Sequence, residues 1–466
     1  MFVAKGETRA PLTPAKAAPQ KADSSLLGLA AQLRPLDDVF GMVRDKNIVL
    51  FGEATHGAQE FYAFRCDVSK RLIEEAGCMG VCIEGDWPEC SALHAFVMSY
   101  SSVSDVDQAL QPFTHRFPVW IWRNQPTRDF LLWLRERNAS KPPEKRAGVF
   151  GLDLYSMALA MESVLKYLDA HDPTAAVEVR KRYSCLQVFM PEPQLYGAGV
   201  AKHHHAGCQR AVLEARNIVV ARLRALAQPK SGLDQKDEAF IAEMNARVVV
   251  DGEAYYRAMF QYDESSWNVR DRHFDDTLYR ARQHLRATRG AGSDRVVVWA
   301  HNSHLGDAGA TGRAASGETN LGQLVRQAAG RGAVVNVGQF THTGTVTAAQ
   351  EWGDAHAARR VRPSLAGSWE AAMHSVSTEA GLPAFAVDFR TREAQTVLKR
   401  DLPSRLERAI GVLYLPDTER QSHYFPARLG EQFDICVWID ETSALQPMDK
   451  APGAVEPELD EYPSGL

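Results

Sequence analysis

The chain has no strong excess of either charge and no long apolar run. Its 466 residues carry 53 lysines and arginines against 58 aspartates and glutamates, a formal net charge of −5. A protein whose main partner is nucleic acid usually needs a basic excess, so the composition argues against that class. No segment approaches the roughly 18 consecutive apolar residues of a membrane span. We therefore expect a globular protein with neither nucleic acid nor a membrane as its partner.

Cysteine is sparse and forms no C-x-x-C pair. The chain has seven cysteines, and four of them fall between residues 66 and 90. An odd count in a long chain argues against a disulfide scaffold, and buried apolar thiols are favoured over a zinc site in that stretch. Residues 1–25 have no apolar core of the kind found in secretory signals. We expect reduced cysteines and a cytoplasmic location.

Several common catalytic and cofactor motifs are missing. There is no G-x-S-x-G elbow, so a serine nucleophile in a hydrolase triad has little support. A P-loop is absent, and no G-x-G-x-x-G follows the first predicted strand, which leaves nucleotide cofactors without support. H-E-x-x-H is also absent, and the histidine tract at 203–205 is interpreted as a solvated loop. We predict no cofactor.

Apolar runs closed by glycine or acidic residues predict the strands. The predicted strands cover 47–51, 80–85, 147–153, 295–300, 333–340, 384–388, 411–415 and 433–439. A helical period over 59–76 joins the first two strands into a βαβ unit, which predicts that these two are parallel and adjacent.

The fold class predicted from these elements is α/β, with a mostly parallel central sheet flanked by helices. Few strand signals occur between 157 and 288, where helical patterns repeat, so we expect a largely helical insertion that forms a second lobe over the cleft. The expected division is a disordered tail at 1–24, a core at 25–156 and 291–447, a helical lobe at 157–290 and an acidic tail at 448–466.

Polar side chains stand at the ends of three predicted strands. Glu53 and His56 follow the first strand, Glu84 ends the second, and His301 and His304 follow the strand at 295–300. In open α/β sheets, ligands bind beyond the carboxyl ends of the parallel strands. We therefore expect these side chains to converge on one cleft.

Carboxylates beside imidazoles suit hydrolysis by an activated water. A histidine with a pKa of about 6.5 takes a proton from water at neutral pH, and a neighbouring carboxylate holds its tautomer and stabilises the imidazolium. Arg65 lies on the helix after the first strand, where it either holds a carboxylate in place or points at a developing oxyanion. The same residue types also bind Zn²⁺ or Mn²⁺, so a metal site stays an alternative.

Weaker signals come from aromatic and polar residues near other predicted strand ends. Trp122, in the segment 120–124, either packs in the core or lines an apolar cleft, and the segment 267–271 has the same ambiguity. Asp153 is either a helix N-cap or a carboxylate that supports the site. We assign substrate binding to His304, Trp122 and Asn302.

These segments, taken together, resemble the erythromycin esterase family. The residues that carry the resemblance are Gly52–Gly57 with Glu60 and Arg65 behind it, Ile83–Gly85, Trp122–Asn124, Gly151–Asp153 and Val298–His304. Their order and strand contexts agree with the family from about residue 25 to 445. The resemblance implies an α/β core with a helical lobe, an active site in the cleft between them, and hydrolysis of the macrolactone ester of 14-membered macrolides without a required metal.

The resemblance also implies roles for individual residues. His56 matches the general base that activates water, and Glu53 matches the carboxylate that supports it. Arg65, Glu84 and His301 match further active-site positions, and His304 matches a histidine near the pocket; these are expectations from the family pattern.

The predicted function is metal-independent hydrolysis of a small-molecule ester or lactone, with macrolide resistance as one version of it. In this hypothesis His56 deprotonates water, Glu53 supports His56, and Arg65 with His301 stabilises the oxyanion, while Glu84 positions the water or tunes a neighbouring pKa. One alternative is a metal-dependent hydrolase of esters or phosphoesters in the same cleft. Another is a non-catalytic protein that binds a small polar ligand there.

Overall fold

The computed structural model describes residues 23–449, apart from 101, 115, 191, 228–230, 262–264 and 399–403. The tails predicted at 1–24 and 448–466 therefore lie almost wholly outside the described residues. None of the helices in the described part is long and apolar enough to cross a membrane.

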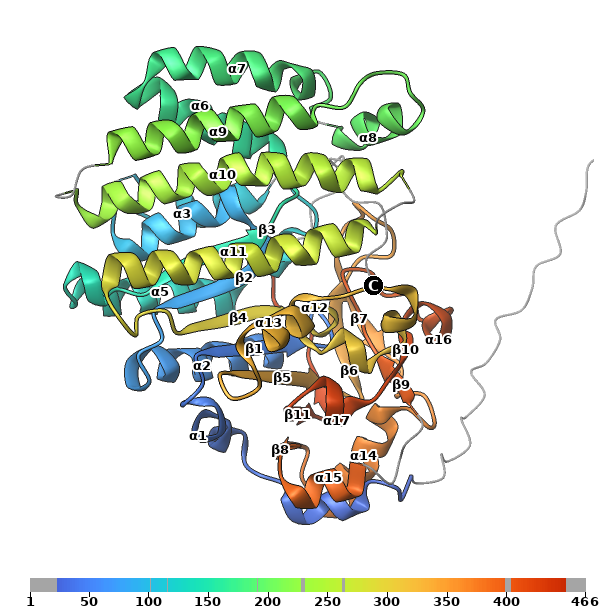
Figure 1. Cartoon of the computed structure of the whole chain (residues 1–466). Coiled ribbons are helices and arrows are strands. Elements are labelled where there is room, and N and C mark those ends of the chain that lie inside the picture. The colour runs from blue at the N-terminus through green and yellow to red at the C-terminus, as the bar shows by residue number, and fades with distance from the viewer. Residues whose placement is uncertain are drawn as a thin grey trace, which may run out of the picture.

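A seven-stranded sheet in the order β3-β2-β4-β1-β5-β11-β8 forms the centre of the molecule (Figure 1). Its strands are β1 (Ile48–Glu53), β2 (Gly80–Asp86), β3 (Gly148–Asp153), β4 (Val296–His301), β5 (Val334–Phe340), β8 (Ala384–Asp388) and β11 (Ile435–Ile439). Every neighbouring pair is parallel except β8 and β11, which are antiparallel. The predicted mostly parallel α/β sheet is thus confirmed.

Both faces of the sheet are covered, so the central strands are buried throughout. Successive side chains of a strand point to opposite faces. Ile48 and Leu50 of β1 accordingly join the core beneath the long helices of residues 157–289, whereas Val49 and Phe51 join the core on the opposite face. This burial on both sides explains why the strands appear in the sequence as continuous apolar runs.

The order of the strands differs from the prediction at one point. β1 and β2 are parallel but not adjacent, because β4 lies between them: Val297 pairs with Val49 on one side and with Val81 on the other. A local sequence pattern cannot show this, since β4 enters the sheet only after the helical region. The consequence matters for the site, because β4 places His301 directly beside Glu53 in the ladder.

The region predicted to be helical is helical. It contains α6 (Met157–His171), α7 (Pro173–Gln187), α8 (Pro193–Ala201), α9 (Gln209–Leu226), α10 (Leu233–Ala258) and α11 (Ser266–Arg289). Figure 1 shows these helices stacked in layers beside the β3 end of the sheet. α11 is the innermost of the long helices and contacts β2 and β3, so its side chains reach the strand ends.

The remaining helices flank the sheet and its C-terminal half. They are α1 (Val39–Val43), α2 (Gln59–Glu75), α3 (Trp87–Met98), α4 (Val106–Leu110), α5 (Gln125–Ala139), α12 (Asn302–Leu305), α13 (Leu321–Ala329), α14 (Trp369–Ala380), α15 (Arg392–Leu398), α16 (Glu419–Ser422) and α17 (Leu429–Gln432). Short 3₁₀ turns include η3 (Gln111–Thr114) and η4 (Val119–Ile121), which precede α5.

Two small sheets were not predicted. One contains β6 (Thr343–Ala348), β7 (Ala357–Val361) and β12 (Glu441–Thr442), and the other contains β9 (Arg405–Arg408) and β10 (Tyr424–Ala427). Most of these strands are rich in Arg or Thr and β10 contains a proline, so they lack the longer apolar run on which the strand predictions depend. The strand predicted at 411–415 is wrong: this segment is a loop in which Leu413 makes only an isolated bridge to Ala349.

Cys185 and Cys208 are joined by a disulfide between the end of α7 and the start of α9. The expectation of fully reduced cysteines is therefore wrong for this pair, which the packing of α7 on α9 brings together. Cys66, Cys78, Cys82, Cys90 and Cys436 are buried free thiols. The four cysteines between 66 and 90 are thus buried thiols, as expected.

Candidate active site

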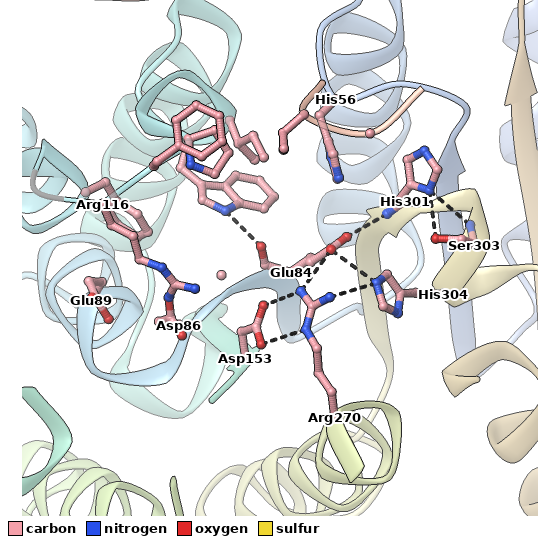
Figure 2. A pocket seen from close by; sticks show the side chains of 18 of the residues that line it. His56, Glu84, Asp86, Glu89, Arg116, Asp153, Arg270, His301, Ser303 and His304 are labelled. Carbon is pink, nitrogen blue, oxygen red and sulfur yellow. Dashed lines mark hydrogen bonds and ion pairs between the residues drawn. The ribbon is translucent and has the colours of Figure 1, made fainter. Parts of the chain in front are cut away.

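A pocket lies at the carboxyl ends of β1, β2, β3 and β4. Side chains from the sheet, from α11, from the segment before α5 and from the loops at 349–356 and 410–412 line it (Figure 2). Four of the residues predicted to converge there do so: His56, Glu84, His301 and His304 all line the pocket. Glu53 lies directly behind His56, buried at 1% exposure.

His56 is held by a buried chain of charged groups. Its Nδ1 lies 3.0 Å from Oε1 of Glu53, and Oε2 of Glu53 lies 2.8 Å from Nη1 of Arg65. A carboxylate oxygen only accepts hydrogen bonds, so Nδ1 of His56 donates to Glu53, and Nε2 is the ring nitrogen left for the pocket. Figure 2 shows the ring of His56 pointing into the pocket. This is the arrangement of a general base with an orienting carboxylate.

Arg65 holds Glu53 and does not reach the pocket. It is completely buried, and its guanidinium carbon lies 3.8 Å from the ring centroid of Tyr62 and 5.1 Å from that of Trp299. Burial alone would lower the pKa of Arg65, but Glu53 together with Tyr62 and Cys66 outweighs burial and raises this pKa, so the arginine stays charged. Of its two predicted roles, the structure favours support of a carboxylate. The predicted contact with an oxyanion is corrected, because Arg65 is not among the residues that line the pocket and its guanidinium packs against aromatic rings.

Three neighbouring groups contact the carboxylate of Glu84. Its Oε2 accepts a hydrogen bond from the backbone N–H of His301 at 2.8 Å, and its Oε1 lies 3.1 Å from Nη2 of Arg270 and 3.3 Å from Nε2 of His304. Burial alone would raise the pKa of Glu84, but His304, His56 and Arg270 together hold it well below the usual range. Glu84 therefore acts as a permanent negative charge that positions its neighbours.

Two residues of α11 supply the counter-charges that the sequence did not identify. Arg270 contacts Asp153 through Nε at 3.0 Å and through Nη2 at 2.5 Å, and Asp271 lies 2.9 Å from Nδ1 of His304. Burial would lower the pKa of His304, but Asp271 and Glu84 raise it to about 9. This pKa favours the imidazolium form of His304 at neutral pH, against the opposing charge of Arg270, whose Nη1 lies 3.2 Å from Nε2 of His304. The segment 267–271 had been ambiguous, because only the packing of α11 on the sheet directs Arg270 to the strand ends.

His301 remains neutral. Burial, and then the neighbouring His56, lowers the pKa of His301 to about 3. Its Nδ1 accepts a hydrogen bond from the backbone N–H of Ser303 at 3.2 Å and lies 2.8 Å from the Ser303 hydroxyl oxygen. The rings of His56 and His301 are 5.0 Å apart. His301 therefore packs beside the base as an uncharged ring at the edge of the pocket.

The two other predicted substrate contacts have different outcomes. Trp122 lines the pocket and donates from Nε1 to the backbone oxygen of Glu84 at 3.0 Å. Asn302 does not line it: its amide donates to the backbone oxygen of Gln339 at 3.1 Å, and its side chain lies against Gly52. We therefore assign Asn302 to packing between strand ends, because the first turn of α12 directs it toward the sheet.

The far end of the pocket is also polar. Arg116 pairs with Asp86, and its guanidinium carbon lies 4.5 Å from the ring centroid of Tyr155. Asp86 accepts hydrogen bonds from the backbone N–H groups of Tyr155 at 2.7 Å and Ser156 at 3.2 Å. Figure 2 shows this cluster across the pocket from His56. No sequence motif marked it, because its members come from separate segments.

The opposite wall is apolar. It is formed by Phe113, Phe117, Pro118, Ile121, Trp122, Trp352 and Val412. Within the described ranges, no three His, Cys, Asp or Glu side chains are grouped so that they could hold a metal ion. The positive charges beside Glu84 and Asp153 come from Arg270 and His304. The arrangement suits an activated water, a developing oxyanion and an apolar substrate body.

The comparisons with known proteins agree with this architecture. A family model described as erythromycin esterase matches residues 73–442, which include Glu84, His301 and His304 but begin after Glu53, His56 and Arg65. A solved structure of a succinoglycan biosynthesis protein is 18% identical, with a TM-score of 0.68 over 91% of this chain and 98% of that one.

Two further solved structures share the fold. A protein from Bacillus cereus is 19% identical, with a TM-score of 0.69 over 92% of this chain and 100% of its own. A histidine-to-asparagine variant of the erythromycin esterase EreC, in its open conformation, is 15% identical, with a TM-score of 0.59 over 90% of this chain and 99% of its own. At such identities these structures show the fold alone.

Proposed function

Since the chain belongs to the erythromycin esterase family, we propose that it hydrolyses a carboxylic ester or lactone with a water activated by His56 and without a metal. The observation that carries the proposal is the buried chain from Arg65 through Glu53 to His56, because it fixes Nδ1 of His56 as a donor to Glu53 and leaves Nε2 as the nitrogen available to a water in the pocket. A positioned base of this kind contributes about 10²–10⁴-fold to a hydrolytic rate.

In the proposed reaction, His56 accepts one proton and later returns it. Nε2 takes a proton from water while the water oxygen bonds to the carbonyl carbon of the ester. The imidazolium, stabilised by Glu53, returns this proton to the leaving alkoxide as the tetrahedral intermediate collapses to acid and alcohol. We assign stabilisation of the oxyanion to Arg270 and His304, the cations beside Glu84 at the pocket floor. Glu84 keeps both in place.

The lining supports an ester with an apolar face. Aromatic and aliphatic side chains form one wall, while charged groups occupy the floor from His304 to Arg116. Pockets of this kind bind the body of a ligand by apolar contact and orient it with a few polar groups. A macrolide lactone is one substrate of this description, and the family makes it the first to test.

The test is turnover of erythromycin and p-nitrophenyl acetate, followed by mass spectrometry and absorbance, with and without EDTA. We expect the wild-type chain to add one water to a substrate, unaffected by EDTA. The His56→Asn variant should lose at least about 10²-fold of kcat/KM. The exposed His171, replaced by Asn, is the matched control and should keep full activity.

Other outcomes favour the alternatives. Loss of activity in EDTA, restored by Zn²⁺ or Mn²⁺, would favour a metal-dependent hydrolase in the same pocket. Binding of the esters without turnover would favour a non-catalytic protein. Full activity of a folded His56→Asn variant would refute the assignment of the base.

A further inference from the structure

Two aromatic side chains meet across the pocket, and neither has a part in the proposed chemistry. Phe117 lies in the segment between η3 and η4, and Trp352 lies at the tip of the loop between β6 and β7. Their ring centroids are 4.6 Å apart, with 66° between the planes, which is an edge-to-face contact. Both residues line the pocket and both are half-buried. The contact therefore lies in its outer wall.

Further contacts beside this one join the segment before α5 to the C-terminal half of the chain. The ring of Trp120, on η4, lies 5.2 Å from that of His356, at the other end of the β6–β7 loop. Arg123 pairs with both carboxylate oxygens of Asp449, at 2.6 and 2.8 Å. The segment before α5 is thus held against the C-terminal half of the chain, and the pocket wall is closed where Phe117 meets Trp352.

The residues next to Trp352 in the sequence contribute little to its burial. Gln350, Glu351 and Asp354 are exposed, and Trp352 between them is half-buried with its ring against Phe117. Removal of the indole would therefore open the wall without removing any group that contacts Glu53, His56 or Glu84. The loop itself is anchored at its base by the β6–β7 ladder.

We propose that Phe117 and Trp352 determine substrate size: their contact sets how large an ester group fits between the apolar wall and His56. This inference rests on the proposed ester hydrolysis. The group enclosed by the two rings is apolar, because the two rings offer it no charged contact and further apolar side chains, among them Ile121 and Val412, line the same pocket. Esters with a small acyl group fit the closed wall, and bulky ones require its opening.

The first experiment compares p-nitrophenyl acetate with p-nitrophenyl diphenylacetate. We expect Trp352→Ala to raise kcat/KM for the bulky ester relative to the small one by about tenfold, with Phe117→Ala similar and Trp352→Phe intermediate. Trp133→Ala, on α5 outside the pocket lining, is the matched control. An unchanged ratio in folded Trp352→Ala and Phe117→Ala variants would overturn the inference.

The second experiment measures access without hydrolysis. Val412 lines the pocket and is half-buried, whereas the free cysteines Cys66, Cys78, Cys82, Cys90 and Cys436 are buried, so a Val412→Cys variant places an accessible thiol in the pocket. We expect Trp352→Ala, added to it, to accelerate labelling by fluorescein-5-maleimide about tenfold more than labelling by iodoacetamide. Equal acceleration of both reagents, or none, would overturn the size limit. If Trp352→Ala accelerates labelling by the larger reagent more than by the smaller one, but the protein cleaves no ester, the size limit set by Phe117 and Trp352 is supported and the proposed ester hydrolysis is refuted.

Discussion

At the scale of single residues, the position of the proposed base His56 depends on Arg65, a charged residue that does not line the pocket. Arg65 is the ion-pair partner of Oε2 of Glu53, and the two residues are buried together. Breaking a buried ion pair by removing one partner is costly, because the other charge is left uncompensated. The orientation of His56 therefore depends on Arg65, which contacts Glu53 and acts on His56 only through it.

Replacing Arg65 tests this dependence. We expect Arg65→Met to lower the free energy of unfolding by about 3–5 kcal/mol and to remove most ester hydrolysis, because Glu53 would remain buried without its cation. Arg65→Lys should retain more of both, since it keeps the charge but loses the planar stacking on Tyr62. Urea unfolding and turnover of p-nitrophenyl acetate measure the two effects. Wild-type stability of Arg65→Met would contradict the role.

His304 predicts the alkaline side of the pH profile. Asp271 and Glu84 raise the pKa of His304 to about 9 against the effect of burial, so the imidazolium exists below that pH and is lost above it. If this cation stabilises the oxyanion, kcat/KM falls as the pH rises through about 9. In His304→Asn the activity is low and this fall disappears. Rates measured from pH 6 to 10.5 check it, and an unchanged fall in His304→Asn would assign it to another group.

At the scale of elements, the loop from β1 to α2 is positioned by one close backbone contact. The backbone oxygen of Gly57 accepts from the N–H of Thr347 on β6 at 2.9 Å and from the N–H of Leu445 at 2.8 Å. A Cβ at Gly57 would lie 2.0 Å from the backbone oxygen of Thr347, so no other residue fits without movement. The β6 strand therefore fixes the loop that carries His56.

Gly57→Ala should affect activity through this contact. We expect the loop to move away from β6 and kcat/KM to fall by about 10²-fold, because small displacements of a catalytic base are costly. Gly41→Ala is the control: it lies on α1, and no atom would be within 4 Å of its new Cβ. Kinetics and thermal unfolding of both variants separate displacement from unfolding. Normal kinetics in Gly57→Ala would show that the loop position does not limit catalysis.

At the scale of the whole molecule, stability has a pH dependence of its own outside the pocket. Glu407, on β9, is completely buried. Burial, reinforced by the nearby carboxylate of Glu370, raises the pKa of Glu407 well above its usual range. The native state therefore keeps a proton that the unfolded chain releases above about pH 4.3. Stability contributed by this proton is present at low pH and is lost as the pH rises toward the raised pKa.

Glu407→Gln should remove this loss of stability at rising pH. Each pH unit over which only the native state holds the proton costs about 1.4 kcal/mol, so the variant should gain stability over wild type as the pH rises from 5 to 8. The exposed Glu393, replaced by Gln, should leave the curve unchanged. Urea unfolding across this pH range is the measurement. Parallel curves for Glu407→Gln and wild type would mean that Glu407 does not titrate there.

Much of the candidate site was visible in the sequence because it lies at strand ends. His56, Glu84, His301 and His304 each follow an apolar run that is buried on both faces, and parallel strands carry such residues to one edge of the sheet. Arg270, Asp271 and Arg116 were not identified, since their direction depends on how α11 and the segment before α5 pack. Arg65 was identified, but which of its two possible contacts it makes depends on tertiary packing, which places it against Glu53 and the rings of Tyr62 and Trp299.

By itself, the sequence determined the class of fold, the helical stretch between 157 and 289 and the main residues of the pocket, because burial imposes local patterns of apolar and polar residues. Only the tertiary structure decided the strand order, the disulfide, the charge states of His301 and His304 and the aromatic wall of Phe117 and Trp352. These depend on contacts between segments far apart in the chain. Pairing, desolvation and electrostatic interaction are set by distance in space, which no local pattern records.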